Sequence, residues 1–147
     1  METPGNPNKT ILVIDDEAFD RDTMRHTLQS EGYTVLEADT YQRAYAVFQS
    51  NTDVIDLLVA DVSLPDGNGC ELALAIRDRR PDIRVLFVSG HVGAEVCRYY
   101  GLDVTDLYYL RKPFTEKELA GRVRQVFAAA EPFPPLYTKR TFSSGRG

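Results

Sequence analysis

Five polar residues follow short apolar runs in this 147-residue sequence, and their types could support phosphoryl chemistry. They are Asp15, Asp16, Asp61, Ser89 and Lys112. Carboxylate oxygens suit a hard cation such as Mg²⁺, and a carboxylate left free can attack phosphorus. Lys112 could neutralise charge on the transferred group, and Ser89 could donate a hydrogen bond to it.

The elements that would position these residues alternate regularly along the chain. Short apolar runs typical of buried strands are separated by longer amphipathic segments typical of helices. This alternation predicts an α/β fold with a parallel sheet and helices on both faces. The expected strands are 11–14, 33–36, 56–61, 83–88 and 107–110; the expected helices are 18–31, one capped by Thr40, 70–79, 92–100, and one that follows Thr115 and ends near 129.

Each polar residue also has an ordinary interpretation. Asp15 and Asp16 could simply cap a helix, and Asp61 could be a loop residue. Ser89 before a glycine is commonly a turn residue, and Lys112 before a proline is commonly a solvated charge. In an open parallel sheet, however, the carboxyl ends of the strands meet at one ligand-binding edge. All four ordinary interpretations would have to coincide there, so we favour a shared site.

Other chemical motifs are weak or missing. Residues 67–72, GNGCEL, partly imitate a dinucleotide-binding motif, but they lack the third glycine and follow the wrong strand. We interpret them as a turn and a helix start. The sequence has no phosphate-binding GxxxxGK[ST] loop, no His/Cys cluster with zinc-ligand spacing and no Gly-x-Ser-x-Gly elbow.

Composition limits the partners and the environment. The formal net charge is −5 and no basic stripe is visible, so we expect no nucleic-acid partner. No apolar run reaches the roughly 20 residues needed to cross a bilayer, so we expect a cytoplasmic chain without membrane contact. Cys70 and Cys97 have no CxxC spacing, and we expect two reduced thiols rather than a disulfide.

The expected domain organisation is simple. Residues 1–8 are interpreted as a flexible leader and residues 9–129 as one globular domain. Residues 130–147 begin with the proline-rich EPFPP, which cannot extend the last helix, and are interpreted as a disordered tail or linker.

Four motifs in order resemble the response-regulator receiver domain of two-component signalling. They are ILVIDDE at 11–17, LLVADVSLPDGNG at 57–69, VLFVSGH at 85–91 and YLRKPF at 109–114. The resemblance covers about residues 9–128. It implies a doubly wound, flavodoxin-like five-stranded parallel sheet of order 2-1-3-4-5. The last two motifs also resemble receivers associated with hybrid histidine kinases.

The resemblance also implies roles for the site residues. Asp61 would accept the phosphoryl group, with Mg²⁺ bound by Asp15, Asp16, Asp61 and the backbone carbonyl of Ser63. Lys112 would pair with the phosphoryl group, and its peptide bond to Pro113 would be cis. Such a chain is a signalling switch, which catalyses only its own phosphorylation and dephosphorylation.

The switch itself would involve Ser89 and Tyr109, whose hydroxyl and ring move together on phosphorylation. Ser63 and His91 are expected to tune the dephosphorylation rate, although both could instead be solvent-facing loop residues. The donor would be a histidine kinase or a histidine phosphotransfer protein. A downstream protein would bind the surface of the fourth helix, fifth strand and fifth helix, and homodimerisation is possible.

Two other functions remain open. A haloacid-dehalogenase-type phosphohydrolase also uses a strand-end aspartate as its nucleophile, but it normally carries a second aspartate where this chain has Ser63. A degenerate receiver would only bind a partner, which the complete acidic set and Lys112 argue against.

Overall fold

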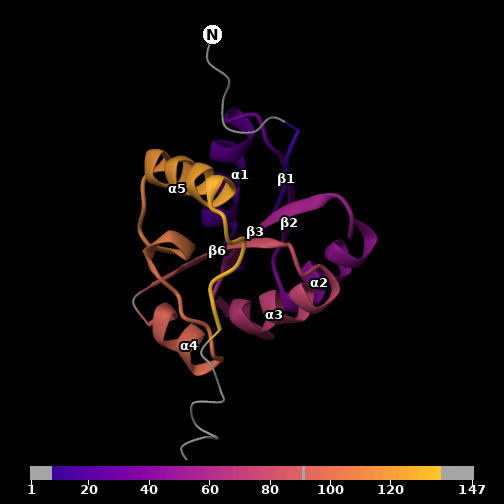
Figure 1. The fold of residues 1–147 in the computed structure, drawn as a ribbon. Coiled ribbons are helices and arrows are strands. Elements are labelled where there is room, and N and C mark those ends of the chain that lie inside the picture. Colours follow the sequence, from indigo (N-terminus) through magenta and orange to yellow (C-terminus); the bar gives the residue numbers. More distant parts are fainter. Residues whose placement is uncertain (1–7, 91, 137–147) are drawn as a thin grey trace, which may run out of the picture.

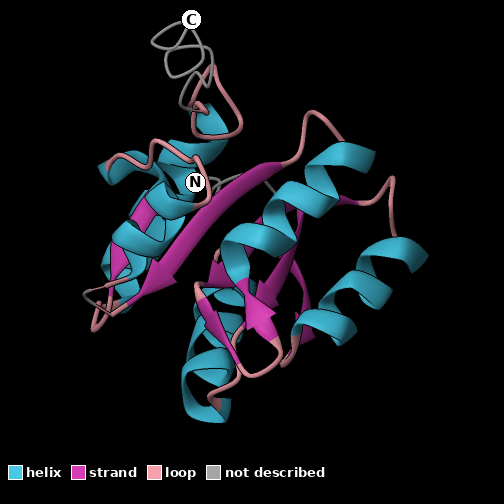
Figure 2. Cartoon of the chain, turned by 90° about the horizontal axis from the view of Figure 1, so that it is seen from below, coloured by secondary structure: helices cyan, strands magenta, loops and turns pink. Residues whose placement is uncertain are grey.

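Residues 8–90 and 92–136 are described by the computed structural model, and they form a parallel sheet between two layers of helices (Figures 1 and 2). The sheet has the order β2-β1-β3-β6-β7, with every neighbouring pair parallel. This is the predicted order, since β6 and β7 are the expected fourth and fifth strands. The strands are β1 (Thr10–Ile14), β2 (Thr34–Ala38), β3 (Ile55–Asp61), β6 (Arg84–Ser89) and β7 (Tyr109–Arg111).

The helices divide between the two faces of the sheet (Figure 1). Helices α1 and α5 cover one face, while α2, α3 and α4 cover the other. The helices are α1 (Ala18–Ser30), α2 (Tyr41–Ser50), α3 (Gly69–Arg79), α4 (Gly93–Tyr99) and α5 (Glu116–Ala128). None of them, in the described part of the chain, combines the length and apolar character that crossing a membrane requires.

Side chains of the central strands alternate between two separate cores. In β1, Ile11 and Val13 face the α1–α5 layer, whereas Leu12 and Ile14 face the α2–α4 layer. Strand residues point alternately to opposite faces, so a strand that is covered on both sides must be apolar at every position. This explains why the strand-forming runs show no polar alternation.

Local signals in the sequence set the ends of several helices. The Thr40 side chain accepts a hydrogen bond from the Arg43 backbone N–H at the start of α2. Thr115 and Glu118 form a capping box at the start of α5, as predicted. Gly32 directly follows Glu31, the C-cap residue of α1. Its φ is 99°, a left-handed conformation that glycine adopts without a Cβ penalty.

Two expected elements differ from the structure. Residues 107 and 108 were predicted to open the last strand, but they lie in a short 3₁₀ turn, η1 (Asp106–Tyr108), and only Tyr109–Arg111 pair with β6. The loop after β3 contains a small hairpin of β4 (Ser63–Leu64) and β5 (Gly67–Asn68). The hairpin ends at Asn68, whose side chain caps α3.

The first part of the expected tail packs against the domain. Phe133 is 5% exposed and belongs to the α2–α4 core, with the Arg77 guanidinium 4.9 Å from its ring centroid. Backbone bonds from Val85 to Pro132 and from Asp103 to Pro135 hold this segment beside the sheet and the loop after α4. Residues 137–147 lie outside the described residues.

The expectation of two reduced cysteines is wrong for this structure. Cys70 in α3 and Cys97 in α4 form a disulfide. The two helices share one face of the sheet, which brings the two Cα atoms to 5.6 Å despite a sequence separation of 27. This separation is within the range that a disulfide requires, but nothing in the cysteine spacing reveals it.

Candidate phosphorylation site

Lys112 lies at the centre of a cluster of carboxylates. Its Nζ atom is 2.8 Å from Asp15 Oδ2, 2.9 Å from Asp61 Oδ2 and 3.0 Å from Asp20 Oδ2. These residues are separated by up to 97 positions in the sequence, so only the fold brings them together. The shared location of acids and amine, predicted from the strand ends, is therefore found in the structure.

The sheet fixes this arrangement through strand ends that lie side by side. Asp15 follows β1, and its backbone N–H donates to the Ala38 carbonyl at the end of β2. Asp61 is the last residue of β3. The Lys112 backbone N–H donates to the Ser89 carbonyl at 2.7 Å, which ties the loop after β7 to the end of β6. The Lys112–Pro113 peptide bond is cis, the geometry that the family resemblance implied.

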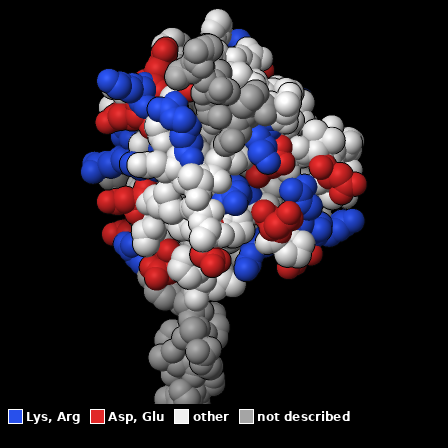
Figure 3. Space-filling view, turned by 45° about the horizontal axis from the view of Figure 1, so that its top comes forward, with Lys and Arg blue, Asp and Glu red and all other residues white. Residues whose placement is uncertain are grey.

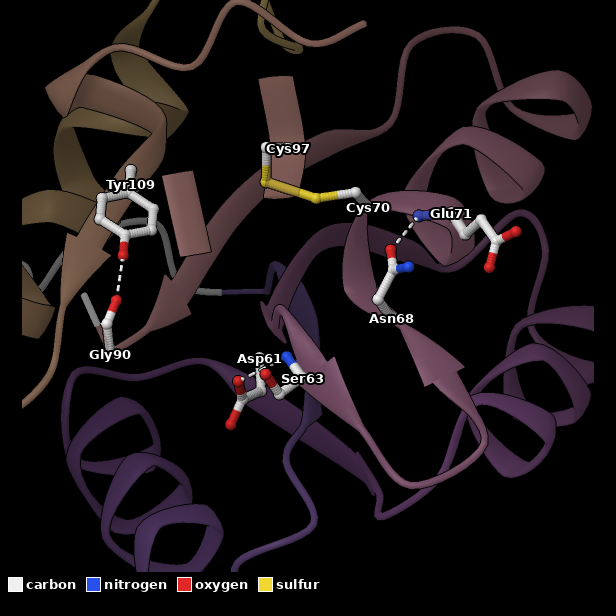
Figure 4. Close-up of a disulfide and its surroundings, with 8 residues drawn as sticks. All are labelled: Asp61, Ser63, Asn68, Cys70, Glu71, Gly90, Cys97 and Tyr109. Atoms are coloured by element: carbon white, nitrogen blue, oxygen red, sulfur yellow. Dashed lines mark hydrogen bonds between the residues drawn. A yellow bond between two sulfur atoms is a disulfide. The ribbon is translucent and has the colours of Figure 1, made fainter. Parts of the chain in front are cut away.

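Asp61 is almost buried, yet it faces an open cavity. The residue is 6% exposed, and its Oδ1 accepts a hydrogen bond from the Ser63 backbone N–H at 3.0 Å. Figure 4 shows this contact at the end of β3. The cavity has a volume of about 480 Å³, so a donor group has a route to Asp61. Its polar lining includes Asp16, Asp20, Asp61, Ser63, Ser89 and Lys112.

The Asp15 carboxyl group is buried, and its hydrogen bonds only partly offset the cost of burying its negative charge. It is 0% exposed, and burial raises the pKa of its carboxyl from 3.8 to about 6, although hydrogen bonds from Lys112 and the Glu17 N–H oppose the rise. Burial likewise tends to lower the pKa of Lys112, but its hydrogen bonds to Asp15 and Asp61 raise that pKa above its usual value. The lysine is therefore charged.

The alternative role for the Asp15–Asp16 pair as a helix cap is not what this structure shows. The N-cap residue of α1 is Glu17, and no side-chain bond caps that helix. Asp15 instead bonds Lys112 and the Glu17 N–H, and Asp16 is exposed beside the cavity. Carboxylate oxygens of Asp15, Asp16 and Asp61 all lie within 4.8 Å of one another. This all-oxygen group could hold a hard divalent cation.

Ser89 and Tyr109 lie next to each other at the start of α4. Ser89 is 4% exposed and lines the cavity, while the Tyr109 hydroxyl donates to the Gly90 carbonyl (Figure 4). A Cβ added at Gly93 would lie 2.4 Å from Ser89 Cβ and 3.0 Å from the Tyr109 hydroxyl. The first turn of α4 therefore rests directly on both residues.

Two parts of the site were not anticipated. Asp20, in the first turn of α1, is a third carboxylate partner of Lys112. The sequence held a weak signal for Asp20, because α1 begins shortly after Asp15–Asp16 and its first turn must therefore lie at the same edge of the sheet. The backbone N–H of Ser63 contacts Asp61, whereas the expectation concerned its carbonyl. His91 lies outside the described residues.

Comparison with known proteins places this geometry in context. Residues 11–124 match the family model of the response regulator receiver domain. The chain is 35% identical over 126 residues to the phosphate regulon transcriptional regulatory protein PhoB of Pseudomonas aeruginosa, covering 84% of this chain and 54% of that protein. It is 34% identical over 117 residues to the sensor kinase CckA of Brucella abortus, covering 80% of this chain and 12% of the kinase.

Solved structures agree with this match. The non-phosphorylated HemR receiver domain of Leptospira biflexa superposes with a TM-score of 0.72 and 31% identity, covering 84% of this chain and 98% of the other. The receiver domain of the hybrid histidine kinase CckA gives a TM-score of 0.65 and 34% identity, covering 79% and 96%. The chain thus spans about half of a curated regulator such as PhoB and nearly all of an isolated receiver domain.

Proposed function

The chain belongs to the response regulator receiver domain family, and from this premise we propose that Asp61 accepts a phosphoryl group from a phosphohistidine donor. The observation that supports the proposal most directly is the bond from Lys112 Nζ to Asp61 Oδ2 at the floor of the open cavity. This family consists of signalling switches, so the proposed result of the transfer is a conformational change in the chain itself rather than a released product.

The proposed transfer breaks the phosphorus–nitrogen bond of the donor histidine and forms a bond from an Asp61 carboxylate oxygen to phosphorus. Both Asp61 oxygens accept hydrogen bonds, one from the Ser63 N–H and one from Lys112, and these bonds fix the direction of the carboxylate. Once the phosphoryl group is attached, Lys112 Nζ can donate a hydrogen bond to one phosphoryl oxygen, and the Ser89 hydroxyl can donate to another. Positioning and charge neutralisation are the main requirements of phosphoryl transfer.

Mg²⁺ fits the donor set at this edge of the sheet. Asp15, Asp16 and Asp61 supply only oxygen atoms, and the buried Asp15 carboxylate is left with an unfavourable charge that Lys112 does not fully offset. We propose that these three carboxylates, with the Ser63 backbone carbonyl, hold the ion. When bound, it would supply positive charge that neutralises phosphoryl oxygens.

The consequence of phosphorylation is proposed to be a shift at Ser89 and Tyr109 that alters the surface of α4, β7 and α5. A downstream protein, or a second copy of the chain, would bind that surface in the cytoplasm. On the face shown in Figure 3, Lys and Arg side chains are interspersed with Asp and Glu. That face therefore lacks the basic stripe by which proteins bind nucleic-acid backbones.

The direct test is incubation with acetyl phosphate and Mg²⁺, followed by intact mass spectrometry. We expect one added phosphoryl group in the wild type and none in Asp61→Asn, and no addition when Mg²⁺ is chelated. Asp56→Asn is a matched control, because Asp56 is on the same strand but bonds the Thr10 backbone far from the cavity.

The phosphohydrolase alternative predicts a different result in the same mixture. A hydrolase would release phosphate from a phosphate ester over many cycles, whereas a receiver would not turn such an ester over. The residue two positions after Asp61 is Ser63, which is exposed and cannot act as the acid or base that such hydrolases place there. Sustained phosphate release that depends on Asp61 would support the hydrolase instead.

A further inference from the structure

Two helices that begin at the phosphorylation site are covalently joined. The disulfide connects Cys70, the second residue of α3, to Cys97 in α4, and both cysteines are 0% exposed (Figure 4). Neither cysteine has a part in the phosphoryl chemistry proposed above. Because the bond joins two helices that contact the site, it should affect how those helices respond to phosphorylation of Asp61.

The α3 end of this link is fixed to the backbone of the phosphoacceptor. Gly69, the residue before Cys70, donates its N–H to the Val62 carbonyl at 2.8 Å. A Cβ added at Gly69 would lie 2.4 Å from the Asp61 carbonyl oxygen. The start of α3 is thus in close contact with Asp61 and has little freedom to move independently of it.

The α4 end of the link is fixed to the pair of residues proposed to switch. Gly93 begins α4 against Ser89 and Tyr109, and Cys97 lies four positions later, about one helical turn along the same face. Any displacement of α4 that follows a movement of Ser89 or Tyr109 must therefore move Cys97 relative to Cys70.

We propose that Cys70 and Cys97 form a redox switch that controls whether α4 can respond to phosphorylation of Asp61. This inference rests on the proposed function. In the oxidised protein the disulfide holds α4 in the position seen here, whereas in the reduced protein α4 is free to move with Ser89 and Tyr109.

The chemistry is a thiol–disulfide exchange with a low-molecular-weight or protein disulfide as the oxidant. The two cysteine thiols lose two protons and two electrons and form one sulfur–sulfur bond, and the oxidant's disulfide is reduced to two thiols. A dithiol reductant reverses the reaction through a mixed disulfide. Disulfides in a reducing compartment are usually transient and redox-sensing, which agrees with a switch better than with a permanent brace.

The buried sulfurs become accessible only when α4 opens, and α4 is built to open more easily than α3. It has seven residues and no side-chain cap at Val92, whereas Asn68 caps the eleven-residue α3. Two large side chains at the ends of α4 are exposed, with Val92 at 55% and Tyr99 at 83%. Short, poorly capped and exposed elements open locally at low free-energy cost. Opening of α4 should therefore expose the disulfide to a reductant, and reduction of the disulfide should in turn make α4 more mobile.

The experiment compares the oxidised full chain, the chain reduced with dithiothreitol, and the double variant Cys70→Ala/Cys97→Ala in both buffers. Alkylation of the denatured protein followed by mass spectrometry first counts free thiols. Acetyl phosphate and Mg²⁺ are then added, Asp61 phosphorylation is measured by intact mass, and hydrogen exchange of the α4 amides is followed. We expect phosphorylation to change α4 exchange several-fold in the reduced chain and in the double variant, with little change in the oxidised chain.

A second readout needs no variant of the cysteines. In a buffer with a fixed ratio of reduced to oxidised dithiothreitol, phosphorylation of Asp61 should raise the ratio of thiol to disulfide at Cys70 and Cys97 several-fold, and the Asp61→Asn protein should show no such shift. The inference is overturned if two free thiols persist after treatment with oxidised glutathione, or if α4 responds equally in the oxidised and reduced chains. Loss of phosphorylation in every preparation would instead contradict the proposed function.

Discussion

Lys112 Nζ lies 2.9 Å from Asp61 Oδ2 and bridges two strand ends of the sheet. The lysine also bonds the fully buried Asp15, so it is the principal positive charge against these two carboxylates. Its removal would leave like charges close together with little access to water. Removal of the lysine alone should therefore lower stability as well as impair the proposed transfer.

Lys112→Ala should lower the free energy of unfolding by about 2 kcal/mol in metal-free buffer, because a partly buried charge cluster loses its cation. Mg²⁺ should restore part of the loss. Urea unfolding with and without Mg²⁺ measures both effects. Arg124→Ala is the control, since its pair with Glu31 is more exposed than the Lys112 cluster and should contribute less than about 1 kcal/mol. Equal losses in the two variants would show that the Lys112 cluster has no special role.

Gly93→Ala should destabilise the protein by roughly 1–3 kcal/mol, because the new methyl group would overlap Ser89 and force α4 away. Gly121→Ala provides the opposite control. A Cβ there, in the middle of α5, would meet only the end of the Arg124 side chain at 4.0 Å, so helix propensity should stabilise the protein by up to about 1 kcal/mol. Thermal unfolding measures both changes. A neutral Gly93→Ala would mean that α4 does not rest on Ser89.

Asp66 should give a pH-dependent contribution to stability. Its carboxylate accepts hydrogen bonds from the backbone N–H groups of Tyr41 and Gln42 at the start of α2, and these bonds lower its pKa below 3.8. The contribution is therefore full above 3.8 and is lost as the pH falls through the lower pKa of the folded state. Asp66→Ala should be less stable than the wild type at neutral pH, and the two should converge in acid. Chemical denaturation across this range measures the difference, and a constant difference would contradict the assignment.

His91→Ala and Ser63→Ala should each change the half-life of the phosphorylated protein, because both positions are expected to border the attacking water. Ser63 is exposed at the cavity, which agrees with this role. Phosphorylated protein can be followed by intact mass after the donor is removed. Thr105→Ala, outside the cavity, is a suitable control. If both half-lives match the wild type, neither residue tunes dephosphorylation.

Most of the sheet was predictable because its strands carry strong local signals. Runs such as 11–14 are apolar at every position, since both faces of the sheet are covered, and caps such as Thr40 and Thr115 mark helix starts. The meeting of Asp15, Asp61 and Lys112 followed from the general rule that parallel strands end at one edge.

The features that were missed depend on contacts between distant elements. The strand expected at 107–110 begins only at Tyr109. The start was misplaced because an apolar run of this length does not distinguish a 3₁₀ turn from a strand. Phe133 is buried by α3 and its neighbours although its proline-rich surroundings suggest a linker. The Cys70–Cys97 bond depends on the approach of α3 to α4, which no local pattern encodes.

The central claim is that Asp61, and no other carboxylate in the cluster, carries the phosphoryl group. Treatment with acetyl phosphate and Mg²⁺, borohydride reduction of the acyl phosphate to an alcohol, and tandem mass spectrometry of the digested protein would locate it. The account predicts the reduced residue at position 61 alone. Modification at Asp15, Asp16 or Asp20, or an unmodified Asp61 in a folded, Mg²⁺-loaded protein, would contradict it.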